Sequence, residues 1–143
     1  MEANLKIDEL WSGWEQSEKS PSDTGTIEMI VRRPQSDERE EVQQAEFDTK
    51  EGLVGDNWLA RGNGSRPDGS ADPEAQVTLM NSRVIQLIAG DKSRWAIAGD
   101  QVFVDFDLSS DNLPAGHRIQ IGEAILEISA IPHTGCAKFA RRF

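Results

Sequence analysis

The sequence contains a single cysteine among its 143 residues, and it has neither a long apolar run nor a secretory leader pattern. One cysteine excludes an internal disulfide and any zinc site built from several cysteines. No stretch reaches the roughly 20 apolar residues that a membrane-spanning helix requires. The first 18 residues are acidic and lack a basic segment followed by an apolar run, so no secretory signal is expected. These absences predict a reduced, cytoplasmic protein with no membrane partner.

The net charge of −10 is concentrated in the first part of the chain. Residues 1–56 hold 15 acidic and 6 basic residues, whereas residues 57–143 hold 10 and 9. The last eleven residues carry no acid and three cations, Lys138, Arg141 and Arg142. Nucleic-acid binding by the whole surface requires a basic face, which this balance excludes. This charge distribution still allows a local cationic pocket for a small anion. An equally good interpretation is that the acidic surface only makes the protein soluble.

Apolar periodicity predicts one helix near the beginning of the chain and a series of short strands after it. A helix is predicted within residues 4–17, where apolar side chains recur at helical spacing at Ile7, Leu10, Trp11 and Trp14. A second helix is predicted at 82–89, where Asn81 can cap it. Strands are predicted at residues 26–32, 42–49, 76–80 and 101–108, and in a hairpin over 117–131.

These elements predict a mostly β, barrel-like domain at 24–143 with a few short helices, preceded by a helical extension at 1–20. Residues 50–75 contain five glycines and two prolines, so they are predicted to form a long loop. Long loops of compact domains are often functional, which directs attention to this part of the chain.

Cys136 is the side chain with the strongest claim to chemistry. It stands in the segment His133-Thr134-Gly135-Cys136, where a short helix is predicted to begin, and helix N-termini favour anions. Lys138 and two arginines add positive charge nearby. This setting favours the thiolate, which is the nucleophilic form of cysteine. The competing interpretation is a small core residue, since free cysteine is among the most buried residue types.

The segment Gly52-Leu53-Val54-Gly55-Asp56 is the second candidate. Its two glycines allow a ligand to approach the backbone closely, and Asp56 can cap or orient the residues that follow. A plain tight turn explains the same pattern, and the Gly-Lys-Ser/Thr ending of a phosphate-binding loop is missing. The two histidines and the scattered acids show no metal-ligand spacing.

Four segments, taken in order, resemble the MOSC domain family, named for the C-terminal domain of molybdenum cofactor sulfurases. They are residues 52–56, 76–80 with the helix after them, 111–116 with 119–128, and 133–136. The resemblance covers about residues 24–143 and implies a MOSC-type β-barrel in a small, stand-alone member of bacterial type. It also implies that Cys136 is the catalytic residue, as a sulfur carrier, or a molybdenum ligand. The implied cofactor-binding residues are Gly52, Gly55, Asp56, Arg61, Asn112, His133, Thr134, Lys138 and Arg141.

Two departures from the family pattern bear on this expectation. Asn57 and Trp58 stand where family members commonly have a basic residue and a histidine. The chain also ends seven residues after Cys136, where family members continue. We therefore expect the barrel to be closed differently, by the N-terminal helix or by a partner chain, and a homodimer is one such arrangement.

The leading hypothesis is a protein that binds a molybdopterin-type cofactor or carries sulfur through a Cys136 persulfide or thiolate. No pyridoxal-phosphate-dependent desulfurase domain is present, so its partner would be a sulfur donor such as a cysteine desulfurase, or a molybdoenzyme. One alternative is a non-catalytic binding or regulatory module that retains the MOSC fold, which the two departures favour. Another is a thiol redox sensor, which would need a resolving cysteine from another chain. The residues leave open whether the protein is an enzyme; the activities that the resemblance implies are sulfur transfer or a molybdenum-cofactor-dependent reaction.

Overall fold

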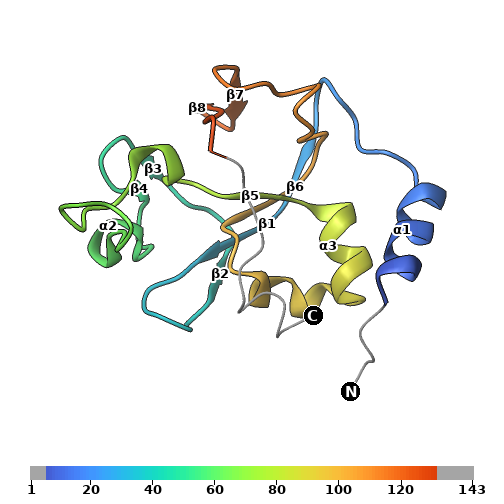
Figure 1. The fold of residues 1–143 in the computed structure, drawn as a ribbon, viewed down its shortest axis with the longest axis horizontal. Helices are drawn as coiled ribbons and strands as arrows, with labels where there is room; N and C mark the ends of the chain where they lie inside the picture. The colour runs from blue at the N-terminus through green and yellow to red at the C-terminus, as the bar shows by residue number, and fades with distance from the viewer. Residues whose placement is uncertain (1–5, 132–143) are drawn as a thin grey trace.

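The structure of the protein is a computed structural model, and it describes residues 6–131. The N-terminal helix lies at one edge of the molecule, and residues 47–61 lie on the opposite side of the central sheet (Figure 1). The helices are α1 (Ile7–Gln16), α2 (Trp58–Arg61) and α3 (Ser82–Ala89), with 3₁₀ helices η1 (Pro73–Ala75) and η2 (Lys92–Ala98). The strands are β1 (Thr26–Arg32), β2 (Glu40–Val42), β3 (Phe47–Asp48), β4 (Gly52–Leu53), β5 (Leu79–Asn81), β6 (Val102–Asp105), β7 (Arg118–Ile121) and β8 (Ala124–Glu127).

Four strands form the main sheet in the order β2-β1-β6-β5. β1 pairs antiparallel with both β2 and β6, whereas β5 runs parallel to β6 with Met80 opposite Phe103. A bulge between Ile27 and Met29 shifts the register of β1 against β6. β1 and β6 therefore form the centre of the sheet, and contacts at their ends position the surrounding segments.

The predicted barrel is wrong for the part of the chain that the structure describes. Helices cover 25% and strands 23%, and the sheets are small and open, so the fold is mixed α/β rather than mostly β. β3 pairs with β4, and β7 with β8, in two-stranded sheets separate from the main one. Residues 40–48 contain only three apolar residues, so they offer no continuous alternating face for a sheet to bury. They form two short strands in place of the single strand predicted at 42–49.

Several elements with local sequence signals were predicted correctly. Asn81 caps α3 as predicted, because its Oδ1 accepts the N–H groups of Arg83 and Val84 at 3.0 Å each. The predicted hairpin also forms, with Ile121 paired to Ala124 across a two-residue turn. β6 ends at Asp105, earlier than the predicted strand, and the 3₁₀ helix η2 was not predicted. The predicted 50–75 loop contains β4, α2 and η1.

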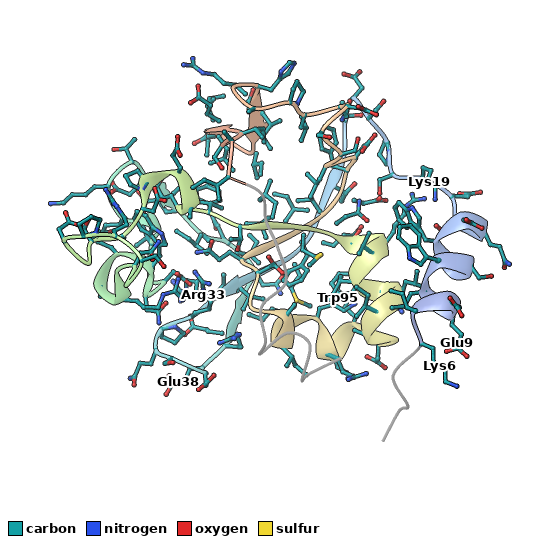
Figure 2. The ribbon with its side chains drawn as sticks, in the orientation of Figure 1. Lys6, Glu9, Lys19, Arg33, Glu38 and Trp95 are labelled. Atoms are coloured by element: carbon teal, nitrogen blue, oxygen red, sulfur yellow. The ribbon has the colours of Figure 1, made fainter. Side chains whose placement is uncertain are left out.

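The main core lies between one face of the sheet and the helices α3 and η2. It consists of six buried side chains, Met29, Val31, Ile85, Ala89, Trp95 and Phe103. The rings of Trp95 and Phe103 lie 5.7 Å apart between centroids, and the Trp95 indole N–H donates to Gln86 Oε1 at 3.1 Å. Figure 2 shows Trp95 beside α3 in this layer. The buried aromatic pair satisfies its polar group while packing tightly.

A network of polar side chains joins α1 to the far end of the sheet. Arg83 binds Asp105 through two hydrogen bonds of 2.8 and 3.1 Å, and it also donates to the carbonyl oxygens of Glu18 and Lys19. Ser20 Oγ donates to Asp105 Oδ1 at 2.7 Å. The hydrogen bonds from Arg83 and Ser20 lower the pKa of Asp105. The α1–β1 connection is thereby fixed to the beginning of α3 and the end of β6.

Gly13 of α1 packs against Leu87 of α3. A Cβ atom on Gly13 would lie 2.6 Å from Leu87 Cδ1, so a larger residue there would require the Leu87 side chain to move. Among residues 6–131, no helix is long and apolar enough to cross a membrane.

Asn81→Ala is expected to lower the free energy of unfolding by about 2 kcal/mol or more, because it removes a helix cap together with further hydrogen bonds of a buried side chain. The Asn81 amide also donates to Ser20 Oγ and to the Phe106 carbonyl. The matched control is Asp91→Ala, which removes the exposed cap of η2 on the Ser93 N–H and should cost clearly less. Urea denaturation measures both, and equal losses would contradict the special role of Asn81.

Candidate functional site

The 52–56 segment forms a tight turn that depends on its first glycine. β4 begins at Gly52, which pairs with Asp48 of β3 and has a φ angle of +76°. A Cβ atom at this position would lie 2.9 Å from Gln76 Cγ and 3.2 Å from the Gln76 carbonyl oxygen. Glycine is therefore required both by backbone conformation and by space. The Gln76 amide donates to the Thr49 carbonyl at 2.9 Å and closes this contact.

Asp56 is anchored by Arg33, which follows the last residue of β1. The Arg33 side chain donates from Nε to Asp56 Oδ1 at 2.9 Å and from Nη2 to Oδ2 at 2.8 Å. The backbone N–H groups of Arg33 and Trp58 donate to the same carboxylate at 2.7 and 3.0 Å. The Asp56 side chain is 0% exposed. A carboxylate with these four bonds has its strong acceptor directions filled by the protein, so we interpret it as an anchor and not as a ligand-binding group.

The contacts of Asp56 favour its ionised form although the side chain is buried. Burial has the largest single influence and raises the pKa of Asp56, but the ion pair and hydrogen bonds from Arg33, with the Trp58 N–H, together hold that pKa below its usual value. The Arg33 guanidinium also donates to the Gly99 carbonyl at 3.2 Å. Arg33 lies between the sheet and the α2 region (Figure 2). It thus connects β1, the 52–56 turn and the loop before β6.

Two more arginines surround the turn. The Arg32 side chain lies over Gly55, since a Cβ atom there would be 2.9 Å from Arg32 Cδ, and Arg32 forms an ion pair with Glu40. Arg61 is the last residue of α2 and is exposed. Within residues 6–131 the Arg61 guanidinium has no hydrogen-bond or ion-pair partner. Partial desolvation and the charge of Arg33 lower the pKa of Arg61, while Asp56 opposes them.

A hollow of about 250 Å³ lies beside this turn. It is lined by Glu51, Gly55, Asp56, Leu59 and Ala60. Its volume is below the range of about 300–1,000 Å³ typical of pockets for small molecules. The hollow is therefore too small for a whole cofactor, and its lining contains two acidic residues and no cation.

The structure brings together Gly52, Gly55, Asp56 and Arg61 of the predicted site residues. Asn112 lies elsewhere, where its amide donates to the carbonyls of Ser22 and Asp107 at 3.0 and 2.8 Å. Ser22 precedes β1 and Arg33 follows it, so the two places lie at opposite ends of a strand roughly 20 Å long. The other predicted residues lie outside the described part of the chain; they are His133, Thr134, Cys136, Lys138 and Arg141.

Sequence reasoning missed Arg33 and Gln101. No local pattern marks Arg33, because its partner Asp56 lies 23 positions away. Gln101 is 0% exposed, and its Oε1 accepts the Thr78 N–H at 2.8 Å. Its Nε2 and the Asn57 Oδ1 are buried atoms without a hydrogen-bond partner. Such atoms are commonly satisfied by ordered water.

Comparison with protein-family models, curated proteins and solved structures finds no match for this chain. The MOSC resemblance therefore stays a prediction from the residues. Among residues 6–131, no group of three or more histidine, cysteine, aspartate or glutamate side chains is arranged to hold a metal ion.

Arg33→Gln is expected to lower the free energy of unfolding by about 3–5 kcal/mol, because it leaves the buried Asp56 carboxylate without its cation. Arg32→Gln is the matched control in the neighbouring position. Its ion pair with Glu40 is partly exposed, so its loss should cost about 1 kcal/mol or less. Urea denaturation of both variants measures the difference, and similar midpoints would show that the Arg33 pair is not an anchor.

The stabilising effect of Asp56 is expected to depend on pH. Its folded-state pKa lies below the unfolded value of about 3.9, so the ionised group stabilises the fold above that pH and loses its effect as pH falls through the folded pKa. The difference in unfolding free energy between wild type and Asp56→Asn should be constant from pH 7 to about 5 and shrink below about 4. A difference that stays unchanged down to pH 3 would contradict this assignment.

Proposed function

We propose that this chain binds a molybdopterin-type cofactor or carries sulfur through Cys136, as the MOSC resemblance implies. The proposal rests on the order of the four motifs and on the residues around the 52–56 turn, and it does not require a closed barrel. A cytoplasmic location, which keeps the single thiol reduced, belongs to the same proposal. Its partners would be a cysteine desulfurase as sulfur donor or a molybdoenzyme as acceptor.

The observation that supports it most directly is the unpaired guanidinium of Arg61. The charges of Arg32 and Arg33 are matched by Glu40 and Asp56, whereas Arg61 has no such partner among residues 6–131. A guanidinium binds phosphate through two parallel hydrogen bonds. The adjacent hollow is lined by two acidic residues, Glu51 and Asp56, and by no cation, so in this proposal Arg61 holds the phosphate outside the hollow.

Among the residues around the turn, the Arg61 guanidinium is the group suited to the phosphate end of a pterin cofactor. Arg61 would hold the phosphate, while the Arg33–Asp56 pair keeps the turn in place. Gly55 lines the hollow and is exposed, and the Arg32 side chain lies over the position that a Cβ atom would take. When bound, the cofactor would supply the redox chemistry of molybdenum. The described residues form no metal-ligating cluster of their own, so metal ligation in this proposal falls to Cys136.

In the sulfur-carrier form of the proposal, the Cys136 thiolate attacks the terminal sulfur of a donor persulfide. A new sulfur–sulfur bond forms at Cys136, the donor's sulfur–sulfur bond breaks, and the donor cysteine leaves as a thiolate. No net oxidant is required because the transferred sulfur is already at the oxidation level of a persulfide. The chain's contribution is to present a thiolate, which the cations near Cys136 favour.

A non-catalytic binding module is the second candidate, and one observation favours it. The Asp56 carboxylate is fully engaged by Arg33 and Trp58, so this motif residue contributes to folding rather than to chemistry. In that case Cys136 would be slow to react with iodoacetamide at neutral pH, whereas a carrier thiolate would react faster than free cysteine.

The full chain, incubated with a cysteine desulfurase and cysteine, is expected to gain the mass of one sulfur atom at Cys136, and Cys136→Ser is expected to gain none. Protein produced with ample molybdate is expected to contain pterin and molybdenum, and Arg61→Gln should lower the pterin content about tenfold through loss of a charged hydrogen bond.

Arg118→Gln is the control for this loss, because it removes an exposed arginine from the β7–β8 hairpin. Absence of both the persulfide and the pterin from wild-type protein, with slow alkylation of Cys136, would overturn the proposal in favour of the binding module. Equal pterin content in Arg61→Gln and wild type would remove Arg61 from it.

A further inference from the structure

The outer face of α1 carries two large apolar side chains that are mostly left uncovered by the rest of residues 6–131. Ile7 is 66% exposed and Trp11 is 61% exposed, and they stand four residues apart, one helical turn from each other. The helix buries none of its residues completely. It lies at the edge of the molecule with α3 on one side (Figure 1). Tryptophan is usually well buried, so an exposed one in a fixed helix requires an explanation.

The inward side of α1 is defined by different residues. Gly13 faces Leu87 of α3, and Leu10 and Trp14 are half-buried. Trp14 is further covered by Lys19, whose ammonium lies 3.8 Å from the ring centroid and donates to the Trp14 carbonyl at 2.6 Å. Trp11 has no comparable cover among residues 6–131. The exposed pair is therefore separate from the packing that holds α1 in place.

The position of α1 is fixed although its contact with α3 is small. A ten-residue helix is marginal by itself in water. Here its N-terminus is capped by Glu9, which accepts the Lys6 N–H at 2.8 Å, and its C-terminal connection is held by Arg83 through the Glu18 and Lys19 carbonyls. Figure 2 shows Lys6 and Glu9 at one end of α1 and Lys19 at the other. The Ile7–Trp11 face is thus presented in a defined orientation, which lowers the entropic cost of binding.

Acidic side chains border this face. Asp8 lies three residues before Trp11 and Glu15 lies four after it, so each is a surface neighbour of the indole on the helix. Residues 6–19 contain four acids and two lysines, and Lys19 is engaged with Trp14. A second copy of the chain would bring the same carboxylates against this face, which like-charge repulsion disfavours. A basic partner would be attracted instead.

We propose that the Ile7–Trp11 face of α1 binds a partner protein through a basic amphipathic helix. The partner's apolar side chains would cover Trp11 and Ile7, and its lysines or arginines would pair with Asp8 and Glu15. Two anchors at helical spacing form a ridge that fits the groove of a second helix. The surface is small, so the complex is weak and transient. This proposal does not rest on the function proposed for Cys136.

The test uses the full chain and a synthetic peptide of about 18 residues with a leucine face bordered by lysines, a length that allows helix formation. Titration calorimetry at low salt should show binding of this peptide and none of its counterpart with glutamates in place of the lysines. Trp11→Ser should weaken binding about tenfold or more, because a central tryptophan is removed. Serine has a helix propensity close to that of tryptophan, so α1 should persist, and circular dichroism with the thermal midpoint checks this.

Ile125→Ser is the matched control, since Ile125 is a 59% exposed apolar residue on the β7–β8 hairpin, and this variant should bind like wild type. Asp8→Asn with Glu15→Gln should weaken binding and reduce its dependence on salt. The proposal is overturned if folded Trp11→Ser binds as tightly as wild type, or if both peptides bind equally. It is also overturned if sedimentation equilibrium shows a dimer that Trp11→Ser dissociates, because a second copy then covers the face.

Discussion

A buried ion pair between Arg33 and Asp56 joins the central sheet to the segment that carries the candidate site. Arg33 directly follows the last residue of β1, and its guanidinium donates hydrogen bonds to both the Asp56 carboxylate and the Gly99 carbonyl. A buried charge that lost its partner would be strongly unfavourable, so the pair sets where the 52–61 segment lies against the sheet. The same pair determines which of the arginines near the turn has an ion-pair partner. Because Asp56 is matched by Arg33, the neighbouring Arg61 has no ion-pair partner among residues 6–131.

A second arginine–carboxylate pair performs the corresponding task at the other end of the sheet. Arg83 and Asp105 fix the α1–β1 connection, with Ser20 and Asn81 completing the network. This pair is partly exposed, unlike Arg33–Asp56, and it depends on several hydrogen bonds rather than on burial. The two pairs lie at opposite ends of β1. The α1 face and the 52–61 segment are therefore positioned by different interactions.

The sequence allowed the prediction of elements whose signals are local. The helix α3 has apolar periodicity, an asparagine cap and a terminal glycine within ten residues, and the β7–β8 turn is marked by Gly122. The barrel was predicted wrongly because sheet closure depends on pairing between distant segments, which local alternation does not determine. For the same reason the sequence did not indicate Arg33, because its ion pair with Asp56 forms only in the folded chain. At the candidate site the 52–56 turn was found, but its chemical character depends on three arginines from two separate segments.

The net charge of −10 has opposite effects on binding at the two proposed surfaces. An anionic ligand is repelled by the protein as a whole, so it can be recognised only through close, paired contacts such as those that a guanidinium offers a phosphate. At physiological salt, screening over about 8 Å reduces the distant repulsion but leaves such contacts intact. A basic partner gains from the same acidic field, which attracts it before contact. An acidic chain can therefore use short-range arginine contacts at one end of β1 and long-range attraction at the other.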